Sequence, residues 1–366
     1  MKARFWLFFG LGISLLVIVG HFTANVQAGT LRQVVATPTY NYKYALPFVA
    51  NNPAPPPIPP PAAPSYYMGT LDPATVINQG CALGQRDVYL SGAQDSVVVL
   101  DFGYPQKYAN GTFGARGFDY PPVYANTDQI AAVVENFGVG YINCSANDPA
   151  SHLRIAIGTS NYPGQYYPAV TYAHGQAWSN MVTAVNTWFT TRCAGTACAN
   201  RVDAAGANDI ELAWNTPAAT LDWLAGYASV AKYQMYNFGA LDGCPWLAHP
   251  TYNCVWPNKD QVWTAIWGSP PVQPIPEIYR TDDINAEQWY LMSVYSYVNH
   301  HEKIQFIGPM TQTGACQQYP ESSCTILGNT PTQAWWQLHN LLNGDPATAG
   351  EALSFPSDIR YMEKAP

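Results

Sequence analysis

The feature that most constrains the fold is a regular alternation of short β-rich runs and helical stretches beyond residue 76. The β-rich runs lie at 96–103, 139–144, 153–161, 209–215, 232–239, 276–281 and 304–310, with 357–362 as a possible eighth. The helical stretches lie at 127–137, 174–191, 217–229, 258–267, 284–299 and 331–343. Strands that alternate with helices indicate parallel βαβ units.

This number of units predicts an α/β fold of the (β/α)8 type, a TIM barrel of seven or eight strands. A doubly wound open sheet is the alternative, but it would normally bind its ligand through a Gly-rich turn, and no GxGxxG occurs. Helix starts support the alternation: Thr127 is a candidate N-cap, and Thr216 precedes a proline in the first turn of the next helix.

The first 28 residues have the pattern of an export signal. Lys2 and Arg4 precede an apolar run from Phe5 to Gly20, and Val26-Gln27-Ala28 resembles a signal-peptidase site. An uncleaved anchor is the alternative, because the run approaches the shortest length that spans a bilayer. Both readings predict a secreted or cell-surface protein that touches a membrane only through an uncleaved N-terminal segment.

Two further regions follow this segment. Residues 29–75 contain PFVANNPAPPPIPPPAAP and predict a stiff proline-rich linker. Residues 76–366 are expected to form a single barrel domain, which we expect to be a monomer. The chain is acidic, with 16 Lys and Arg against 24 Asp and Glu, and has no basic cluster, so nucleic acid is not expected as a partner.

Eight cysteines, all beyond the export signal, predict disulfides that staple loops. Three pairs are close neighbours in sequence, which leaves the first two cysteines for each other. The most economical pairing is therefore Cys81–Cys144, Cys193–Cys198, Cys244–Cys254 and Cys316–Cys324. Zinc is the competing interpretation, but no CxxC occurs, and we expect neither a metal nor a cofactor.

The stretch NDIELAWN (208–215) carries two carboxylates inside an apolar run. Read as a strand, its period of two places Asp209, Glu211 and Ala213 on one face. The opposite, apolar face would pack against the helices, so both acids are expected to point into the barrel. Because active sites of such barrels gather at the C-terminal ends of the strands, Glu211 becomes the candidate general acid, with Asp209 raising its pKa.

Other strands offer polar residues to the same cavity. Asp101 and Glu277 are the candidates for the second carboxylate that glycoside cleavage requires. Alternatives stay open for each acid. Asp101 could tie loops together, Glu277 could lie lower in the barrel, and Asp209 could pair with Arg154. Candidate substrate-binding residues at or after strand ends are Tyr236, Tyr279, Asn215, Trp214, Ser160, Asn161 and Trp246.

The Asp-x-Glu of Asp209 and Glu211 resembles the acid pair of barrel glycosidases, namely family 25 lysozymes and, more loosely, family 18 chitinases. The resemblance implies that Glu211 is the proton donor and that Asp209 orients the attack. QMYN (234–237) is similar to a chitinase run whose tyrosine lines a sugar subsite, which implies that role for Tyr236. The aspartates that precede the pair in chitinases are missing, since Ala204, Ala205 and Ala207 occupy that region.

Tyrosines and tryptophans in the predicted loops, among them Tyr104, Tyr162 and Trp256, suit stacking on sugar rings or packing on one another. No nucleophile elbow, HxH or HExxH occurs, which disfavours serine and metal hydrolases. The expected function is a secreted glycoside hydrolase-like protein that acts on a cell-wall or environmental polysaccharide. The alternative is a non-catalytic barrel that binds a glycan or the cell surface.

Overall fold

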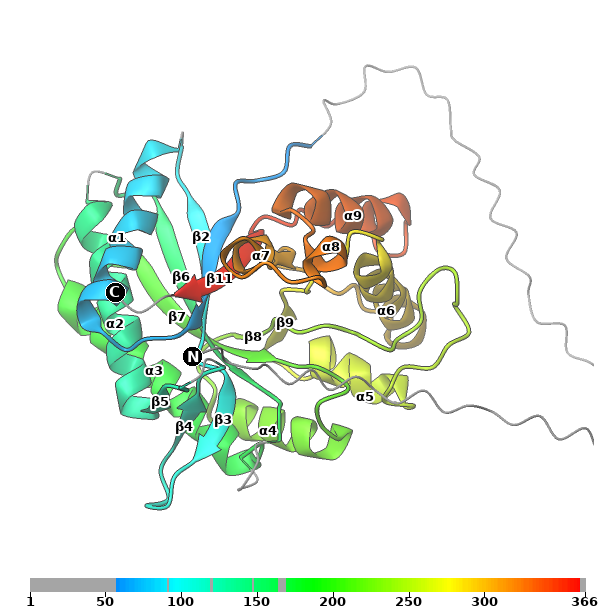
Figure 1. Cartoon of the computed structure of the whole chain (residues 1–366), viewed down its shortest axis with the longest axis horizontal. Coiled ribbons are helices and arrows are strands. Elements are labelled where there is room, and N and C mark those ends of the chain that lie inside the picture. The colour runs from blue at the N-terminus through cyan, green and yellow to red at the C-terminus, as the bar shows by residue number, and fades with distance from the viewer. Residues whose placement is uncertain (1–56, 91, 119–120, 147, 164–168, 363–366) are drawn as a thin grey trace, which may run out of the picture. The chain divides into compact units, whose positions relative to one another are not determined.

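The computed structural model describes residues 57–90, 92–118, 121–146, 148–163 and 169–362 (Figure 1). The predicted export signal (1–28) and residues 29–56 of the predicted linker lie outside these ranges. Among the described helices, none combines the length and the apolar character that crossing a bilayer requires.

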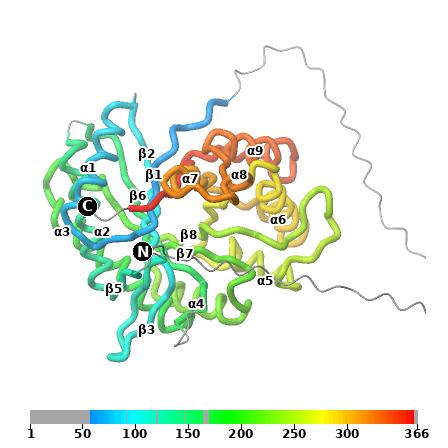
Figure 2. Tube along the Cα trace, in the orientation of Figure 1, coloured from blue at the N-terminus to red at the C-terminus, as the bar shows by residue number. Residues whose placement is uncertain are grey.

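Eight strands of the described chain form one parallel sheet in the order β10-β11-β1-β2-β6-β7-β8-β9. The sheet curls into a half-barrel, which confirms the predicted α/β class. The first and last strands, β1 and β11, pair along their whole length and lie side by side in Figure 2. The strands are β1 (Ala63–Met68), β2 (Asp95–Asp101), β6 (His152–Ser160), β7 (Val202–Asp209), β8 (Met235–Asn237), β9 (Val272–Pro274), β10 (Met310–Thr311) and β11 (Ser357–Met362).

The two edges of the sheet approach each other after β9. Glu277 forms an isolated parallel bridge with Met310 of β10. The backbone N–H of Ile278 donates to Met310 O at 2.9 Å, and Met310 N–H donates to Pro276 O at 2.8 Å. The chain segment that carries Glu277 is therefore held against the opposite edge strand.

The curled sheet separates two cores. Its inner face carries mostly small or β-branched side chains, such as Val99, Ala156, Ala205 and Ala207, which pack inside the curl. Its outer face packs against helices, α1–α3 on one side of the molecule and α6 and α9 on the other (Figure 1). The helices are α1 (Pro73–Tyr89), α2 (Thr127–Cys144), α3 (Tyr172–Cys193), α4 (Pro217–Val230), α5 (Lys259–Trp263), the π-helix η1 (Thr264–Gly268), α6 (Ile284–His300), α7 (Thr313–Gln318), α8 (Cys324–Leu327) and α9 (Pro331–Gly344).

A small antiparallel sheet follows β2 and interrupts the βα alternation. Its strands are β3 (Tyr104–Lys107), β4 (Phe113–Arg116) and β5 (Tyr124–Asn126). Asn126, the last residue of β5, caps α2 in a capping box with Gln129, so Thr127 is the first helical residue rather than the predicted N-cap. Thr216 caps α4 ahead of Pro217, as predicted.

Four predicted strands are wrong. Of residues 276–281 only Glu277 makes a bridge, and of residues 304–310 only Met310 lies in a strand. Residues 139–144 form the end of α2, because the apolar side chains from Ile130 through Phe137 to Tyr141 recur at helical spacing and are all buried. The strand predicted at 209–215 lies earlier, as β7, and only Asp209 belongs to both. Its residues 204–207 are alanines and a glycine, which have low β-propensity. A small residue is needed at Gly206, where a Cβ atom would lie 2.5 Å from the Tyr227 ring.

The folded part also begins earlier than predicted. β1 and the first turn of α1 fall inside residues 29–75, the range assigned to the linker. The strand was hidden because prolines flank it on the N-terminal side and Pro64 lies within it. β1 nevertheless pairs with both β2 and β11, and the Ser65 and Ser357 hydroxyls share a hydrogen bond of 2.5 Å.

All four predicted disulfides are present: Cys81–Cys144, Cys193–Cys198, Cys244–Cys254 and Cys316–Cys324. Every cysteine of the chain is thus paired. Such a set is consistent with an extracellular protein, because disulfides persist in oxidising compartments.

Candidate functional site

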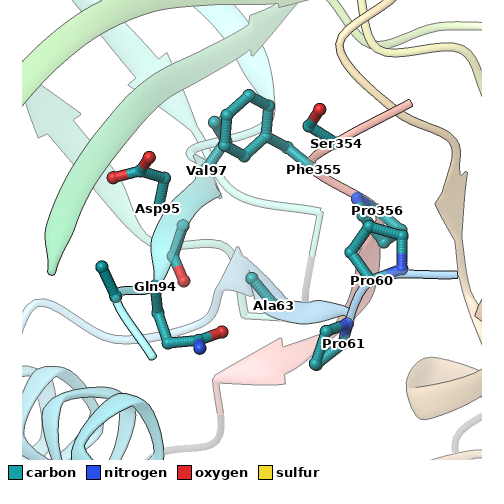
Figure 3. Close-up of a pocket in the computed structure, with 11 residues that line it drawn as sticks. Pro60, Pro61, Ala63, Gln94, Asp95, Val97, Ser354, Phe355 and Pro356 are labelled. Carbon is teal, nitrogen blue, oxygen red and sulfur yellow. The ribbon is translucent and has the colours of Figure 1, made fainter. Parts of the chain in front are cut away.

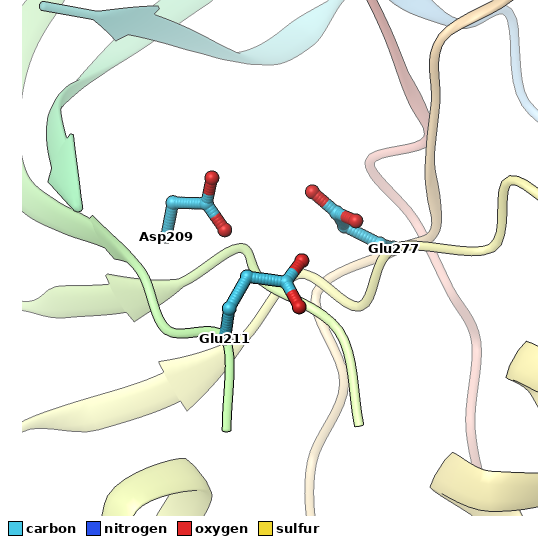
Figure 4. Close-up of side chains that lie close together, drawn as sticks. All are labelled: Asp209, Glu211 and Glu277. Carbon is cyan, nitrogen blue, oxygen red and sulfur yellow. The ribbon is translucent and has the colours of Figure 1, made fainter. Parts of the chain in front are cut away.

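Three carboxylates converge at the C-terminal ends of the strands: Asp209, Glu211 and Glu277 (Figure 4). One oxygen of each lies within 4.8 Å of one oxygen of each of the others. Asp209 is the last residue of β7 and continues the inner face of Ala205 and Ala207. The cluster is therefore placed by two chain segments, the end of β7 and the stretch after β9.

Glu211 reaches the cluster from a turn, since β7 has already ended at Asp209. The sequence predicted Glu211 within a strand, whereas the structure places it in the turn that follows β7. Asn161, just after β6, holds this turn through its side-chain amide. Its Nδ2 donates to Glu211 O at 2.9 Å, and its Oδ1 accepts from Glu211 N–H at 3.1 Å. Asn161 was predicted to bind substrate, and the structure places it against the backbone of the candidate acid.

Gly239 brings the segment of Glu277 close to the end of β7. A Cβ atom at this position would lie only 2.4 Å from Ile210 O, so the close approach requires glycine. On its other side, Gly239 O accepts a hydrogen bond from Glu277 N–H at 3.2 Å. Gly239 thus allows the two segments that carry the acids to lie close together.

Burial, followed by the charge of a neighbouring acid, raises the pKa of all three carboxyl groups. Asp209 and Glu277 are only 5% and 7% exposed. Burial is the main cause of the raised pKa of Asp209, followed by the charge of Glu211, and Glu277 is raised in the same way by burial and then by Asp209. Burial, followed by the charge of Asp242, raises the pKa of Glu211 to about 8. The cluster therefore retains at least one proton at neutral pH.

Asp101, the fourth predicted acid, lies at the end of β2 and is completely buried. Its Oδ1 accepts a hydrogen bond from Gly103 N–H at 2.9 Å, which caps the turn after the strand. Burial raises its pKa to about 7, and its charge contributes to the raised pKa of Asp209. Asp101 does not line the cavity that the three clustered acids share.

The cluster opens into a cavity of about 260 Å³. The remaining lining residues are aromatic, amide or charged, apart from one alanine and one leucine. They are Tyr67, Trp214, Ala240, Asp242, Tyr279, Arg280, Asn285, Gln312 and Leu327. Trp214 and Tyr279 were predicted from the sequence. The sequence analysis did not identify Asp242, which lies five residues beyond the end of β8. An acid near the C-terminal end of a strand is the same signal that identified Glu211.

Besides Asn161, four predicted binding residues do not line this cavity. The Tyr236 hydroxyl accepts from Arg154 at 3.1 Å inside the curl. The Ser160 hydroxyl accepts from Tyr162 N–H, and Asn215 Nδ2 donates to Asn161 O, so both tie loops together. Trp246 packs on His249 and Tyr252 in its own loop.

Two further sequence interpretations are corrected by the structure. Arg154 does not pair with Asp209, because both of its terminal nitrogens face acceptors lower in the curl and Asp203 holds it at 2.6 and 2.7 Å. Trp256 is buried rather than free for stacking on sugars, and its Nε1 donates to Leu212 O at 2.8 Å.

A second cavity, of about 280 Å³, lies at the opposite, N-terminal ends of β1 and β2 (Figure 3). Pro60, Pro61, Phe355 and Pro356 form much of its wall. Asp95 is its single titratable lining residue among those described, so this cavity lacks the paired groups that acid–base chemistry requires.

The acid cluster can act chemically in two ways. In the first, as in retaining glycosidases, one carboxyl group donates a proton while another attacks a carbon atom. In the second, the carboxylates jointly bind a hard cation such as Ca²⁺ or Mg²⁺. A comparison of the chain with protein-family models gives no match, and neither does a comparison with curated proteins. The geometry of the site is therefore the basis for assigning a function.

Proposed function

We propose that this chain is an exported glycoside hydrolase that cleaves a polysaccharide by carboxylate catalysis. The observation that carries the proposal is the convergence of Asp209, Glu211 and Glu277 on one cavity at the C-terminal ends of the strands. Trp214, Tyr67 and Tyr279 on the cavity wall provide flat faces with polar tips, which suit a sugar ring.

The roles follow from position and charge. Glu211, the least buried of the three, is protonated near neutral pH and donates its proton to the glycosidic oxygen. Ionised Glu277 attacks the anomeric carbon as the bond to the leaving group breaks, forming a glycosyl ester. Glu211, now ionised, then takes a proton from water, and this water displaces Glu277 from the sugar. Asp209 raises the pKa of Glu277 by charge repulsion, which favours keeping a proton within the cluster.

The spacing supports retention of the anomeric configuration. Retaining enzymes hold their two carboxyl groups about 5–5.5 Å apart, whereas inverting enzymes leave about 6.5–9.5 Å for a water molecule. One oxygen of each acid lies within 4.8 Å of one oxygen of each of the others, which is closer to the spacing of retaining enzymes.

We infer further that the curled sheet closes into a (β/α)8-type barrel. The N–H of Ile307, just before β10, donates to the carbonyl of Pro274 in β9, and the N–H of Ile278, after β9, donates to Met310 O in β10. These hydrogen bonds join the two edges of the sheet. Closure would place Glu277 across the mouth of the barrel from Asp209, which is where barrel enzymes collect their catalytic groups.

Glycan binding without hydrolysis is the second candidate. The deep burial of Asp209 and Glu277 favours it, since a nucleophile must reach the sugar. A row of aromatic rings leading to the cavity would serve a binding protein equally well: Tyr104 contacts Tyr162 at 4.6 Å, and Tyr162 contacts Trp214 at 5.8 Å between centroids.

The choice between a hydrolase and a glycan-binding protein is tested by counting the reducing ends released from peptidoglycan, chitin and glucans. We expect the wild type to release sugar and Glu211→Gln to lose about a hundredfold or more of the rate, the contribution of a general acid. Glu302→Gln is the matched control, because Glu302 is exposed just beyond α6 and accepts from Trp267 through an oxygen that glutamine keeps. If both the wild type and Glu211→Gln bind a polymer but release no sugar from it, the chain is a binding protein.

A further inference from the structure

The cavity of the acid cluster carries far more negative than positive charge. Of its lining residues, four are acidic (Asp209, Glu211, Asp242 and Glu277) and one is basic, Arg280. The guanidinium of Arg280 is already held by Asp282, with nitrogen–oxygen distances of 2.9 and 2.5 Å. Asp282 therefore compensates most of the charge of Arg280, which also lowers the pKa of Asp242, and the four acids of the cavity outnumber its one cation.

Asp242 contributes to this excess without being needed for bond cleavage. It lies at the cavity rim, where its side chain is exposed, and its Oδ1 accepts from Asn285 Nδ2 at 3.3 Å. The Oδ1 of the same asparagine accepts from Arg280 N–H at 3.0 Å. Asn285 thus connects the carboxylate of Asp242 to the backbone of Arg280, another lining residue of the cavity.

A neutral sugar that entered this cavity would exclude water from several carboxylates without supplying a counter-charge, which is costly. A uronic acid would add like charge. A sugar with a protonated amino group would instead form charge-assisted hydrogen bonds with these carboxylates. The chemistry of the wall therefore favours a cationic amino sugar over both other classes.

We propose that the substrate is a polysaccharide of sugars with free amino groups and that Asp242 binds one such ammonium at the cavity rim. This inference rests on the hydrolase activity proposed above. It also agrees with the need for a carboxylate nucleophile. A free amine has no acetamido oxygen to attack its own anomeric carbon, so the attacking oxygen must come from the protein, here from Glu277.

The test compares poly-glucosamine and poly-galactosamine with their fully N-acetylated forms, a neutral glucan and a polyuronate, at a pH that protonates the amines. The wild type is expected to show a kcat/KM at least tenfold higher for one free-amine polymer than for its N-acetylated form. Asp242→Asn should lower this ratio roughly tenfold to a hundredfold, the range for a hydrogen bond to a charged group.

Asp95→Asn is the matched control. It removes the same charge from an exposed aspartate at the N-terminal end of β2, the opposite end from the acid cluster, and should keep the wild-type ratio. Cleavage of N-acetylated, neutral or acidic polymers at rates equal to or above those of the amines would overturn the inference and leave the hydrolase proposal standing. Absence of cleavage in the whole panel would overturn both. An unchanged ratio in Asp242→Asn would remove Asp242 from substrate recognition.

Discussion

The side chain of Asn161 binds both backbone polar groups of Glu211, accepting from its N–H at 3.1 Å and donating to its C=O at 2.9 Å. Because Glu211 lies in a turn beyond the end of β7, no sheet hydrogen bonds fix its backbone. Trp214 N–H also donates to Glu211 O within the turn at 3.1 Å, so the buried amide that follows β6 is the side chain that fixes the backbone of the candidate general acid.

Replacing this amide should displace the acid. We expect Asn161→Ala to lower kcat roughly tenfold to a hundredfold, since small misplacements of catalytic groups cost about this much, and to destabilise the fold by about 1–3 kcal/mol by leaving backbone groups unpaired. Asn186→Ala is the control, because Asn186 makes the same two hydrogen bonds to Ala204, farther down β7. The positioning role would be confirmed if both variants lose similar stability but only Asn161→Ala loses kcat. Equal losses of kcat in the two variants would contradict it.

The pH dependence of the rate should report the raised pKa of Glu211. A general acid must be protonated, so kcat is expected to fall as pH rises through about 8. The charge of Asp242 is one cause of that raised pKa, after burial. Asp242→Asn should therefore move the alkaline limb of the kcat profile to lower pH. An alkaline limb that stays in place, or moves upward, would show that Glu211 does not supply the proton.

The buried carboxyl of Asp101 should make stability depend on pH. Its pKa is about 7 in the folded protein and near 3.8 when unfolded, so the folded state holds a proton that the unfolded state loses between these values. Stability contributed by this proton is complete below pH 3.8 and lost as pH rises through 7. The free energy of unfolding of Asp101→Asn, relative to that of the wild type, should be higher at pH 8 than at pH 4 by about 1 kcal/mol or more. Urea unfolding at the two pH values measures this difference. An equal difference at both pH values would contradict this linkage.

A retained proton, rather than a metal ion, should relieve the repulsion within the acid cluster of the working enzyme. The pKa of Glu211, raised to about 8, keeps a proton there near neutral pH, and burial raises the pKa values of Asp209 and Glu277 as well. Activity is therefore expected to survive prolonged treatment with EDTA. A loss that Ca²⁺ or Mg²⁺ restores would show instead that the three oxygens hold a cation.

The sequence made parts of this site predictable and concealed others. Asp209 and Glu211 could be found because ionised groups are costly inside an apolar run, whatever the exact strand boundary. The boundary itself was misplaced because β7 is built of alanine and glycine, which carry almost no strand signal. Tyr67 was missed because its strand follows a proline run that resembles a linker.

Tertiary contacts decided the remaining roles. Nothing local distinguishes Asn161, which holds the backbone of Glu211, from Tyr236, whose hydroxyl faces Arg154 inside the curl. Asn161 follows β6, Tyr236 is the middle residue of β8, and both were predicted to contact a ligand. The direction of a side chain within a curved sheet depends on neighbours that are distant in sequence, and a single sequence does not reveal them.

The most direct test of the central claim is the configuration of the first product, recorded by time-resolved ¹H NMR during hydrolysis of a defined oligosaccharide. Carboxylate oxygens within 4.8 Å of one another predict that the new reducing end first appears with the anomeric configuration of the substrate and then mutarotates. First appearance of the opposite anomer would contradict the assignment of Glu211 and Glu277 as acid and nucleophile.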